Sequence, residues 1–280
     1  MRTITGFLLS VALLACACAA GQAADQISSS AETYSLTGEA NPARTSMRPP
    51  FSTRIEQTAT LEGIKIAASY DAHFDPASGR FRAEGVIRPF DAADTEGGVK
   101  VAITNDGMTL RQLVVSRKPG QPALLCTYDL STINRSFPDF DPSSAFCPLA
   151  WSRLISSAGE HLAPAKGVVR GDSVLIFTIA AEGKIFVPII SPSATGRAPI
   201  RLPDLQDVAI SVAEKDGIPR HVEMRGKNGE TLMTVDYKDL TWARDFPDTL
   251  VRIDTPPGAI QMDGTPLLTS MLDQDAEAIE

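Results

Sequence analysis

The residues best suited to acid–base or metal chemistry are three histidines, His73, His161 and His221. Protein metal sites place their ligands at short, regular spacings, which these histidines do not have. We therefore predict that each is a surface or loop residue. The sequence also has no G-x-S-x-G motif, no H-E-x-x-H motif and no glycine loop that could cradle a phosphate. These observations indicate a protein that is not an enzyme and that has no metal or cofactor.

Two pairs of aspartates are candidates for a calcium site. Asp139 and Asp141 flank Phe140, and Asp236 lies close to Asp239. Calcium needs about six to eight oxygen ligands, and no further ligands accompany either pair. We therefore interpret both pairs as solvated turn residues.

Cysteine chemistry is the remaining option, and here the spacing favours a structural role. Cys16 and Cys18 lie in the N-terminal apolar segment, which leaves Cys126 and Cys147 in the body of the chain. An even pair in an exported protein typically forms a disulfide. The alternative, a redox or metal pair, lacks a C-x-x-C motif. We predict one Cys126–Cys147 disulfide, which would stabilise the fold by roughly 3 kcal/mol.

The N-terminus has the pattern of a secretory signal peptide. Met1-Arg2 supplies a positive charge, and the apolar run from Gly6 to Ala20 is followed by small residues. We assign residues 1–24 to the signal peptide and expect the mature protein in the periplasm. The segment that ends at Cys16 also resembles a bacterial lipobox. Lipidation of Cys16 is therefore an alternative, and it would anchor the protein to a membrane.

Length and composition limit the fold and the possible partners. Removal of the signal peptide leaves about 255 residues, which suits one large β-rich domain or two small ones. A hydrophobic share of 43% and a charged share of 21% are ordinary for a globular protein. A net charge of −8 argues against nucleic acid as a partner. We divide the mature chain into a flexible Pro/Ser-rich arm at 25–52, a β-rich domain at 53–263 and a C-terminal tail at 264–280.

Alternation of apolar and polar residues predicts antiparallel strands in the first half of the domain. Turn residues separate these strands at Asp75 to Ser78, at Asn105-Asp106-Gly107 and at Pro119-Gly120. Consecutive strands joined by short turns form a meander most simply. The predicted strands are 64–75, 79–88, 99–104, 108–117 and 124–128.

A helix is predicted after these strands. Asp141-Pro142-Ser143-Ser144 is a helix-start signal, and apolar residues recur at helical spacing from Ala145 to Ala158. Trp151 lies on this helix and Cys147 lies in its first turn. The predicted disulfide would therefore hold the helix against the strand at 124–128.

The segment 168–190 is apolar on both faces when it is extended. Val174 and Ile176 point to one side, whereas Leu175, Phe177 and Ile179 point to the other. A strand that is apolar on both sides must be covered on both sides. The segment is therefore either an ordinary buried strand or one wall of an apolar cleft.

The stretch 206–263 carries the clearest pattern in the chain. Lys215-Asp216-Gly217 and Lys227-Asn228-Gly229 separate three alternating runs, and Asp-Gly and Asn-Gly are typical of tight hairpins. The pattern predicts a three-strand meander, a short strand near Val251 to Ile253 and a Pro-Pro-Gly stop at 256–258.

This order of elements resembles the end of the LolA-like superfamily. Its members are periplasmic carriers of outer-membrane lipoproteins, lipid-binding lipoproteins and RseB-like proteins. The resemblance covers about the last quarter of the chain. It implies an α+β, mainly β fold: a single strongly curved antiparallel sheet, or half-open barrel, with one or two helices on its concave face. The N-terminal helix and the lid arginine of the family are not evident in this sequence.

In the resembled family the concave cleft holds acyl chains. We therefore predict a non-catalytic envelope protein that binds or carries an acyl chain, a lipid or a lipoprotein. The alternative is a structural or stress-sensing protein with a filled core that binds another envelope protein. The hydrophobic pattern suggests six residues that would line the cleft: Trp151, Leu175, Phe177, Ile179, Phe186 and Ile189.

Overall fold

The structure, a computed structural model, describes residues 48–61, 64–89, 98–116, 120–138, 140–158, 162–180 and 205–277. The predicted signal peptide with Cys16, most of the predicted arm, and the candidate residues Phe186 and Ile189 lie outside these ranges. What the sequence predicts for those segments stays a prediction.

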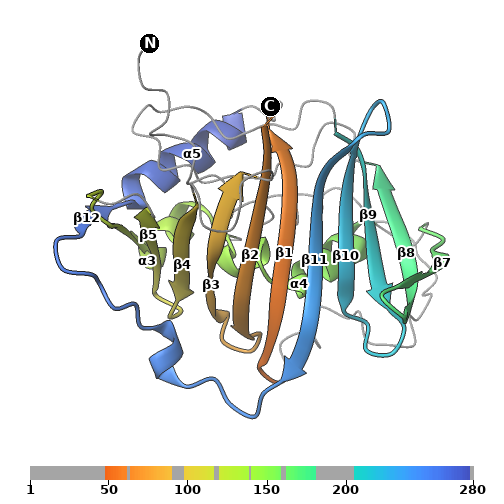
Figure 1. Cartoon of the computed structure of the whole chain (residues 1–280), viewed down its shortest axis with the longest axis horizontal. Helices are drawn as coiled ribbons and strands as arrows, with labels where there is room; N and C mark the ends of the chain where they lie inside the picture. Colours follow the sequence, from red (N-terminus) through yellow and green to blue (C-terminus); the bar gives the residue numbers. More distant parts are fainter. Residues whose placement is uncertain are drawn as a thin grey trace.

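Twelve strands form one sheet that does not close into a barrel (Figure 1). Its order is β12-β6-β5-β4-β3-β2-β1-β11-β10-β9-β8-β7. The predicted fold class, a mainly β fold built on one curved, half-open sheet, is confirmed. The strands are β1 (Phe51–Leu61), β2 (Ile64–Asp75), β3 (Arg80–Pro89), β4 (Val99–Asn105), β5 (Thr109–Ser116), β6 (Leu124–Asp129), β7 (Ala165–Val169), β8 (Asp172–Ala180), β9 (Leu205–Ala213), β10 (Pro219–Gly226), β11 (Thr231–Trp242) and β12 (Ile260–Asp263).

The predicted C-terminal meander is present as β9, β10 and β11, with positive φ angles at Gly217 (66°) and Gly229 (78°) in its two turns. The predicted strand near Val251 to Ile253 is wrong. That position holds a 3-10 helix, η2 (Asp248–Val251), and the strand comes later, as β12. β12 pairs in parallel with β6 and is the exception to the antiparallel pattern.

Helices cover one face of the sheet, which we call the inner face; the opposite face is the outer face (Figure 1). The predicted helix begins three residues late, because Asp141 first caps a 3-10 turn, η1, and Pro148 then opens the helix. A short helix capped by Asp129 was not predicted. The helical elements on this face are α3 (Leu130–Ser136), η1 (Pro142–Ala145), α4 (Pro148–Ser157) and α5 (Thr265–Glu277).

The segment expected to be a C-terminal tail forms α5, which packs against α3 and β6. Its Leu268 and Leu272 are buried in the main core, so the segment belongs to the folded domain. No helix in the described part of the chain has the length and apolarity needed to cross a membrane.

Residues 243–259, which we call the strap, connect β11 to β12 along the outer face. Arg82 donates hydrogen bonds from Nη1 to the carbonyls of Leu250 (3.0 Å) and Arg252 (2.8 Å). These carbonyls are therefore bound by a side chain and take no part in a strand ladder, which explains why no strand forms at Val251 to Ile253. The strap also covers a small apolar cluster on this face: Ala102, Leu113, Ala123 and Leu125, with Ile253 and Ala259 packed against them.

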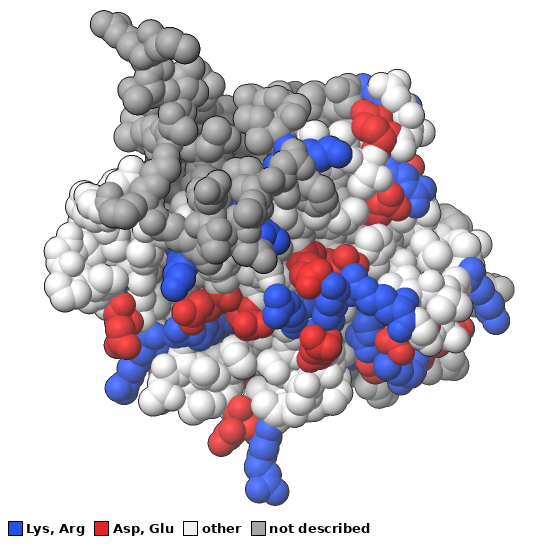
Figure 2. Space-filling model, in the orientation of Figure 1, with Lys and Arg blue, Asp and Glu red and all other residues white. Residues whose placement is uncertain are grey.

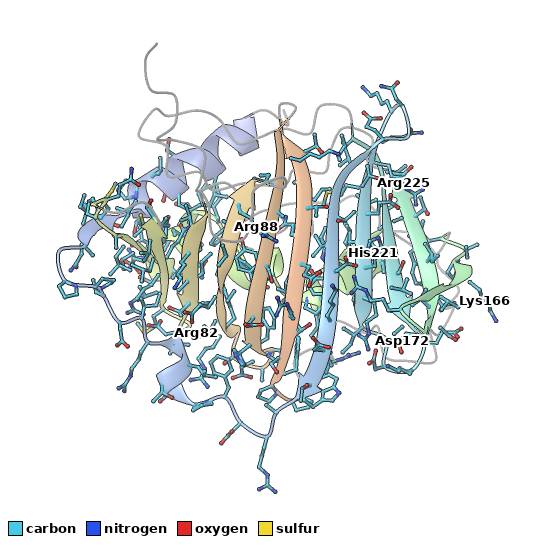
Figure 3. All side chains as sticks on the ribbon, in the orientation of Figure 1. Arg82, Arg88, Lys166, Asp172, His221 and Arg225 are labelled. Atoms are coloured by element: carbon cyan, nitrogen blue, oxygen red, sulfur yellow. The ribbon has the colours of Figure 1, made fainter. Side chains whose placement is uncertain are left out.

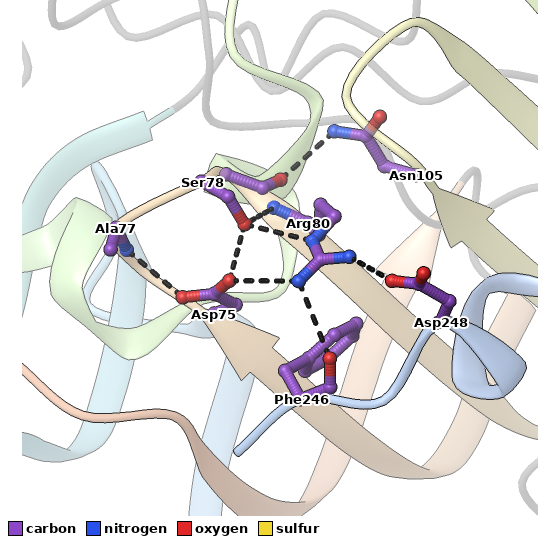
Figure 4. Close-up of polar contacts among 8 residues, drawn as sticks. Asp75, Ala77, Ser78, Arg80, Asn105, Phe246 and Asp248 are labelled. Atoms are coloured by element: carbon purple, nitrogen blue, oxygen red, sulfur yellow. Dashed lines mark hydrogen bonds and ion pairs between the residues drawn. The ribbon is translucent and has the colours of Figure 1, made fainter.

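Arg80 fixes the start of the strap to the β2–β3 hairpin (Figure 4). Its guanidinium forms an ion pair with Asp248 (2.6 Å), donates to the carbonyl of Phe246 (3.3 Å) and lies 5.2 Å from the centre of the Phe246 ring. Asp75 accepts from the same guanidinium at 3.4 Å. Because Asp75 and Arg80 end β2 and begin β3, the predicted turn between these strands also anchors a segment that lies far away in sequence.

The inner face is organised around a row of side chains from neighbouring strands. Tyr237 of β11 lies opposite Ile55 of β1, Ile55 opposite Tyr70 of β2, and Tyr70 opposite Gly85 of β3. A Cβ atom on Gly85 would lie 1.9 Å from the Ser69 carbonyl oxygen and 2.7 Å from Cδ1 of Tyr70. The Tyr70 ring therefore lies over the glycine, and no larger residue fits there.

We expect Gly85→Ala to lower the free energy of unfolding by about 2–3 kcal/mol, because the new methyl group overlaps backbone as well as the ring. Gly167→Ala is the matched control. Its Cβ would meet mainly the flexible end of Ile176 at the sheet edge, and we expect a loss below about 1 kcal/mol. Urea unfolding measures both; equal losses would contradict the close approach of Tyr70 to Gly85.

Candidate functional site

The structure brings four of the six predicted cleft residues into one apolar core on the inner face. Trp151 of α4 and Phe177 and Ile179 of β8 are each less than a tenth exposed, and half-buried Leu175 packs against the same core. The predicted residues therefore share a face. In the described part of the chain they are packed and do not line an open cavity.

Trp151 joins α4 to the sheet through a polar contact inside this core. Its indole Nε1 donates to the hydroxyl of Tyr237 at 2.8 Å. A buried indole N–H without a partner would be costly, so this hydrogen bond fixes the orientation of the ring. The main strand contact of α4 is with β10, next to β11.

Tyr70 is a buried inner-face residue that the sequence pattern did not single out. Its ring stands edge-on to Phe146, with ring centres 5.9 Å apart. Its hydroxyl is buried and has no hydrogen-bond partner in the described structure. Burial raises the pKa of Tyr70 well above its ordinary value, so the hydroxyl stays protonated and can donate. Continuing the alternation of Ile66 and Ala68 by one step would have placed Tyr70 on the inner face.

The predicted Cys126–Cys147 disulfide is not formed: both residues are free, buried thiols. Cys126 lies on β6 beside Tyr128, whereas Cys147 is the residue that precedes α4. Burial raises the pKa of Cys147 to about 12, and it also raises the pKa of Cys126. A thiol that stays protonated is a poor nucleophile and a poor metal ligand. In this structure the two cysteines act as small core residues.

The outer face carries acidic and basic side chains in a band across the strands (Figure 2). Neighbouring charges of opposite sign pair with each other, for example Arg82 with Glu84 at 2.6 Å and Arg225 with Glu223 at 3.2 Å. Lys238 pairs with Glu56 in the same way. Because its charges are largely matched, this band solvates the described part of the outer face.

One row of the outer face has the composition of a catalytic triad. Ser211, His221 and Asp236 are direct neighbours across β9, β10 and β11. His221 lies on the central strand of the three, β10 (Figure 3), and its Nδ1 lies 2.7 Å from Oδ1 of Asp236. Ser211, however, is only 4% exposed, and no described hydrogen bond joins it to His221. A catalytic serine must reach its substrate, so the row does not form a hydrolase site.

His221 and Asp236 instead belong to an ion-pair network. Nη2 of Arg170, in the β7–β8 turn, lies 2.8 Å from Oδ2 of Asp236. Burial by itself would raise the pKa of Asp236, but the hydrogen bond from His221 and the positive charges of His221 and Arg170 outweigh it, so the pKa is lowered. The network ties the edge hairpin to β11.

The other polar residues considered as candidates include Asp141, which has a structural role, and the histidines. Asp141 caps η1 and pairs with Arg153 at 2.8 Å. No group of three or more potential metal ligands occurs among the described residues. His73 and His221 lie in strands on the outer face, and His161 lies outside the described ranges.

The described residues line two surface hollows that do not include the predicted cleft residues. One of about 380 Å³ lies on the outer face and is lined by residues that include Val86, Lys100, Leu113 and Val115. The other, of about 430 Å³, lies between the starts of α3 and α5, where Asp129 and Asp263 face it.

No protein-family model and no curated protein sequence matches the chain. Among solved structures it is similar to an uncharacterized conserved protein from Thermus thermophilus, at 9% identity and a TM-score of 0.42, over 79% of this chain and 94% of that one. It is also similar to the MucA/MucB complex of Pseudomonas aeruginosa, at 10% identity and a TM-score of 0.33, over 76% of this chain and 58% of the matched chain.

A third similar structure is a LolA superfamily protein from Nitrosomonas europaea, at 12% identity and a TM-score of 0.28, over 80% of this chain and 99% of that one. A protein of the superfamily suggested by the C-terminal pattern is thus among the structures that this chain resembles. At such low TM-scores the likeness carries no argument about function.

We expect Asp236→Asn to weaken the acid sensitivity of the fold. Because the pKa of Asp236 is lowered in the folded state, its contribution to stability is complete above the unfolded pKa of about 3.9 and is lost as pH falls through the lower, folded value. The variant should therefore be less stable than wild type at neutral pH. The difference should begin to shrink near pH 4 and should vanish only below the lowered, folded pKa.

The measurement is urea unfolding as a function of pH. Asp239→Asn, on the same strand and exposed, is the control and should follow wild type throughout. A constant difference between Asp236→Asn and wild type at every pH would show that the Asp236 ion pairs do not form.

Proposed function

We propose that this chain is an exported, non-catalytic envelope protein that holds an acyl chain, of a lipid or a lipoprotein, against the inner face of its sheet. The observation that carries the proposal is the extent of the apolar inner face compared with its helices. Twelve strands at about 4.8 Å spacing span roughly 50 Å of arc. α3 and α5 pack at the β5–β6 end, and among the described helices α4, whose ten residues span about 15 Å, is the one that packs on the β10 side. The proposed site runs along the inner face beneath α4 and the turn that leads into it, from Phe177 on β8 to Phe146 and the neighbouring β2.

Entry of a guest requires part of the cover to move, because Phe177 and Ile179 are already buried. α4 is the element best placed to do so, and its Trp151–Tyr237 hydrogen bond contributes about 1 kcal/mol. Each buried methylene of an acyl chain contributes about 0.8 kcal/mol, so about ten methylenes contribute roughly 8 kcal/mol. The guest can therefore offset the loss of this contact.

A second candidate function, binding of a protein partner, is favoured by the β12 edge. The N–H group of Ile260 donates to the carbonyl of Ala123, just before β6, and the N–H group of Gly264 donates to the carbonyl of Thr127 in β6, each at 2.8 Å. The alternate backbone groups of β12 therefore face away from the sheet. Ile260 is 52% exposed and Met262 is 48% exposed. An exposed edge strand with apolar side chains can pair with an extended segment of another protein.

The deciding experiment is native mass spectrometry of the mature protein isolated from its own envelope, together with lipid extraction. We expect the wild type to carry a stoichiometric acyl-bearing ligand that is absent from Phe177→Asp. A carboxylate at this buried position makes binding of an apolar chain unfavourable. Val168→Asp is the matched control. Val168 is 72% exposed on the edge strand β7, so this variant should keep the bound mass.

Circular dichroism establishes whether Phe177→Asp is folded. If it is not, Phe177→Ala replaces it, and we expect this variant to retain less of the acyl-bearing ligand than the wild type. A ligand-free mass for the wild type, with no uptake of a fluorescent fatty acid, would contradict the carrier function. Protein cross-linking to a partner through β12 would then support the second candidate.

A further inference from the structure

Three tyrosines are almost completely buried in the described core, and two of them have hydrogen-bond partners. Tyr128 donates to Oε1 of Gln112 at 3.3 Å, and Tyr237 accepts from Trp151 at 2.8 Å. Tyr70, 1% exposed, is the exception, because no described group bonds to its hydroxyl. Nearly all buried polar groups in folded proteins are paired, so this hydroxyl is a donor that lacks its acceptor.

The position of Tyr70 is fixed by packing on several sides. Its ring lies over Gly85, and Phe146, between η1 and α4, meets it edge-on. Phe146 also contacts Phe81 of β3, with ring centres 5.6 Å apart. The hydroxyl is therefore held in place on the inner face, beneath the polypeptide that leads into α4.

The surroundings of the hydroxyl determine which acceptor fits. The pKa of Tyr70 is raised by burial alone, with no contribution from a charged group. An ionised carboxylate brought to this position would lose its hydration and gain no cation among the described residues. A neutral carbonyl oxygen accepts the same hydrogen bond at much lower desolvation cost.

We infer that Tyr70 is the polar contact of the proposed acyl site and that the guest is an ester-linked acyl chain, whose carbonyl oxygen accepts a hydrogen bond from the Tyr70 hydroxyl. The inference rests on the proposed function and specifies its ligand. The chain of the guest lies against Phe146 and the inner face, and a free fatty acid binds poorly in its ionised form.

Binding to the mature protein is measured with three probes of equal chain length: palmitic acid methyl ester, ionised palmitate and hexadecane. We expect the wild type to bind the ester most tightly. Tyr70→Phe should weaken ester binding about five- to tenfold, the range expected for one buried hydrogen bond, and should leave hexadecane binding unchanged. Tyr128→Phe is the matched control, because it removes a buried hydroxyl that already has a partner, and it should not affect the preference for the ester.

Infrared spectroscopy of a carbon-13-labelled ester tests the contact directly. The carbonyl band should shift to lower frequency in the wild type and not in Tyr70→Phe. If ester binding and this band are the same in both proteins, the inference is wrong even though the acyl site exists. If the wild type binds none of the probes, the proposed function itself fails.

The stability of the ligand-free protein provides an independent test. Removal of an unpaired buried hydroxyl should leave the urea midpoint of Tyr70→Phe equal to or above that of the wild type. A clear decrease would show that the hydroxyl already has a partner, such as a buried water, and would overturn the inference.

Discussion

A sheet of twelve strands that stays open must cover its apolar face with other parts of the same chain. The whole architecture follows from that requirement. Strand after strand places apolar side chains on the inner face and charged or small ones on the outer face, so a one-residue slip in any pairing would expose the core. The helices α3, α4 and α5 all contribute buried residues to the same core. The outer face is covered only in part, by the strap over its small apolar cluster, and elsewhere on the described strands its charges pair with one another.

The sequence predicts well those parts of the fold that depend on local signals. Gly217 and Gly229 adopt the positive φ angles that their hairpins require, and the strands on either side follow from alternation. Contacts between distant segments cannot be predicted from the pattern of any short stretch of sequence. The strap near Val251 has apolar residues that suit a strand, but Arg82 donates hydrogen bonds to the carbonyls of Leu250 and Arg252. The β12–β6 pair and the docking of α5 depend on tertiary packing in the same way.

For the proposed site, the sequence predicts which face a side chain lies on but not what packs against it. Periodicity correctly places Phe177 and Ile179 on the inner face, because a strand fixes the direction of each side chain. It does not reveal whether that face is open or filled, which depends on what packs above it. Tyr70 matters because of Gly85 on the neighbouring strand and an unpaired hydroxyl, and both are properties of the folded molecule. The number of cysteines predicted a disulfide, but Cys126 and Cys147 are buried separately in the core as free thiols.

The strap and β12 also constrain when this protein can fold. The sheet's β6 edge is completed by Ile260–Asp263, and Arg80 and Arg82 contact residues more than 160 positions further along the chain. Such contacts give a high contact order, which slows folding. During synthesis from the N-terminus, β6 emerges with its outer edge unpaired and its partner not yet made. The finished sheet is therefore a product of the nearly complete chain.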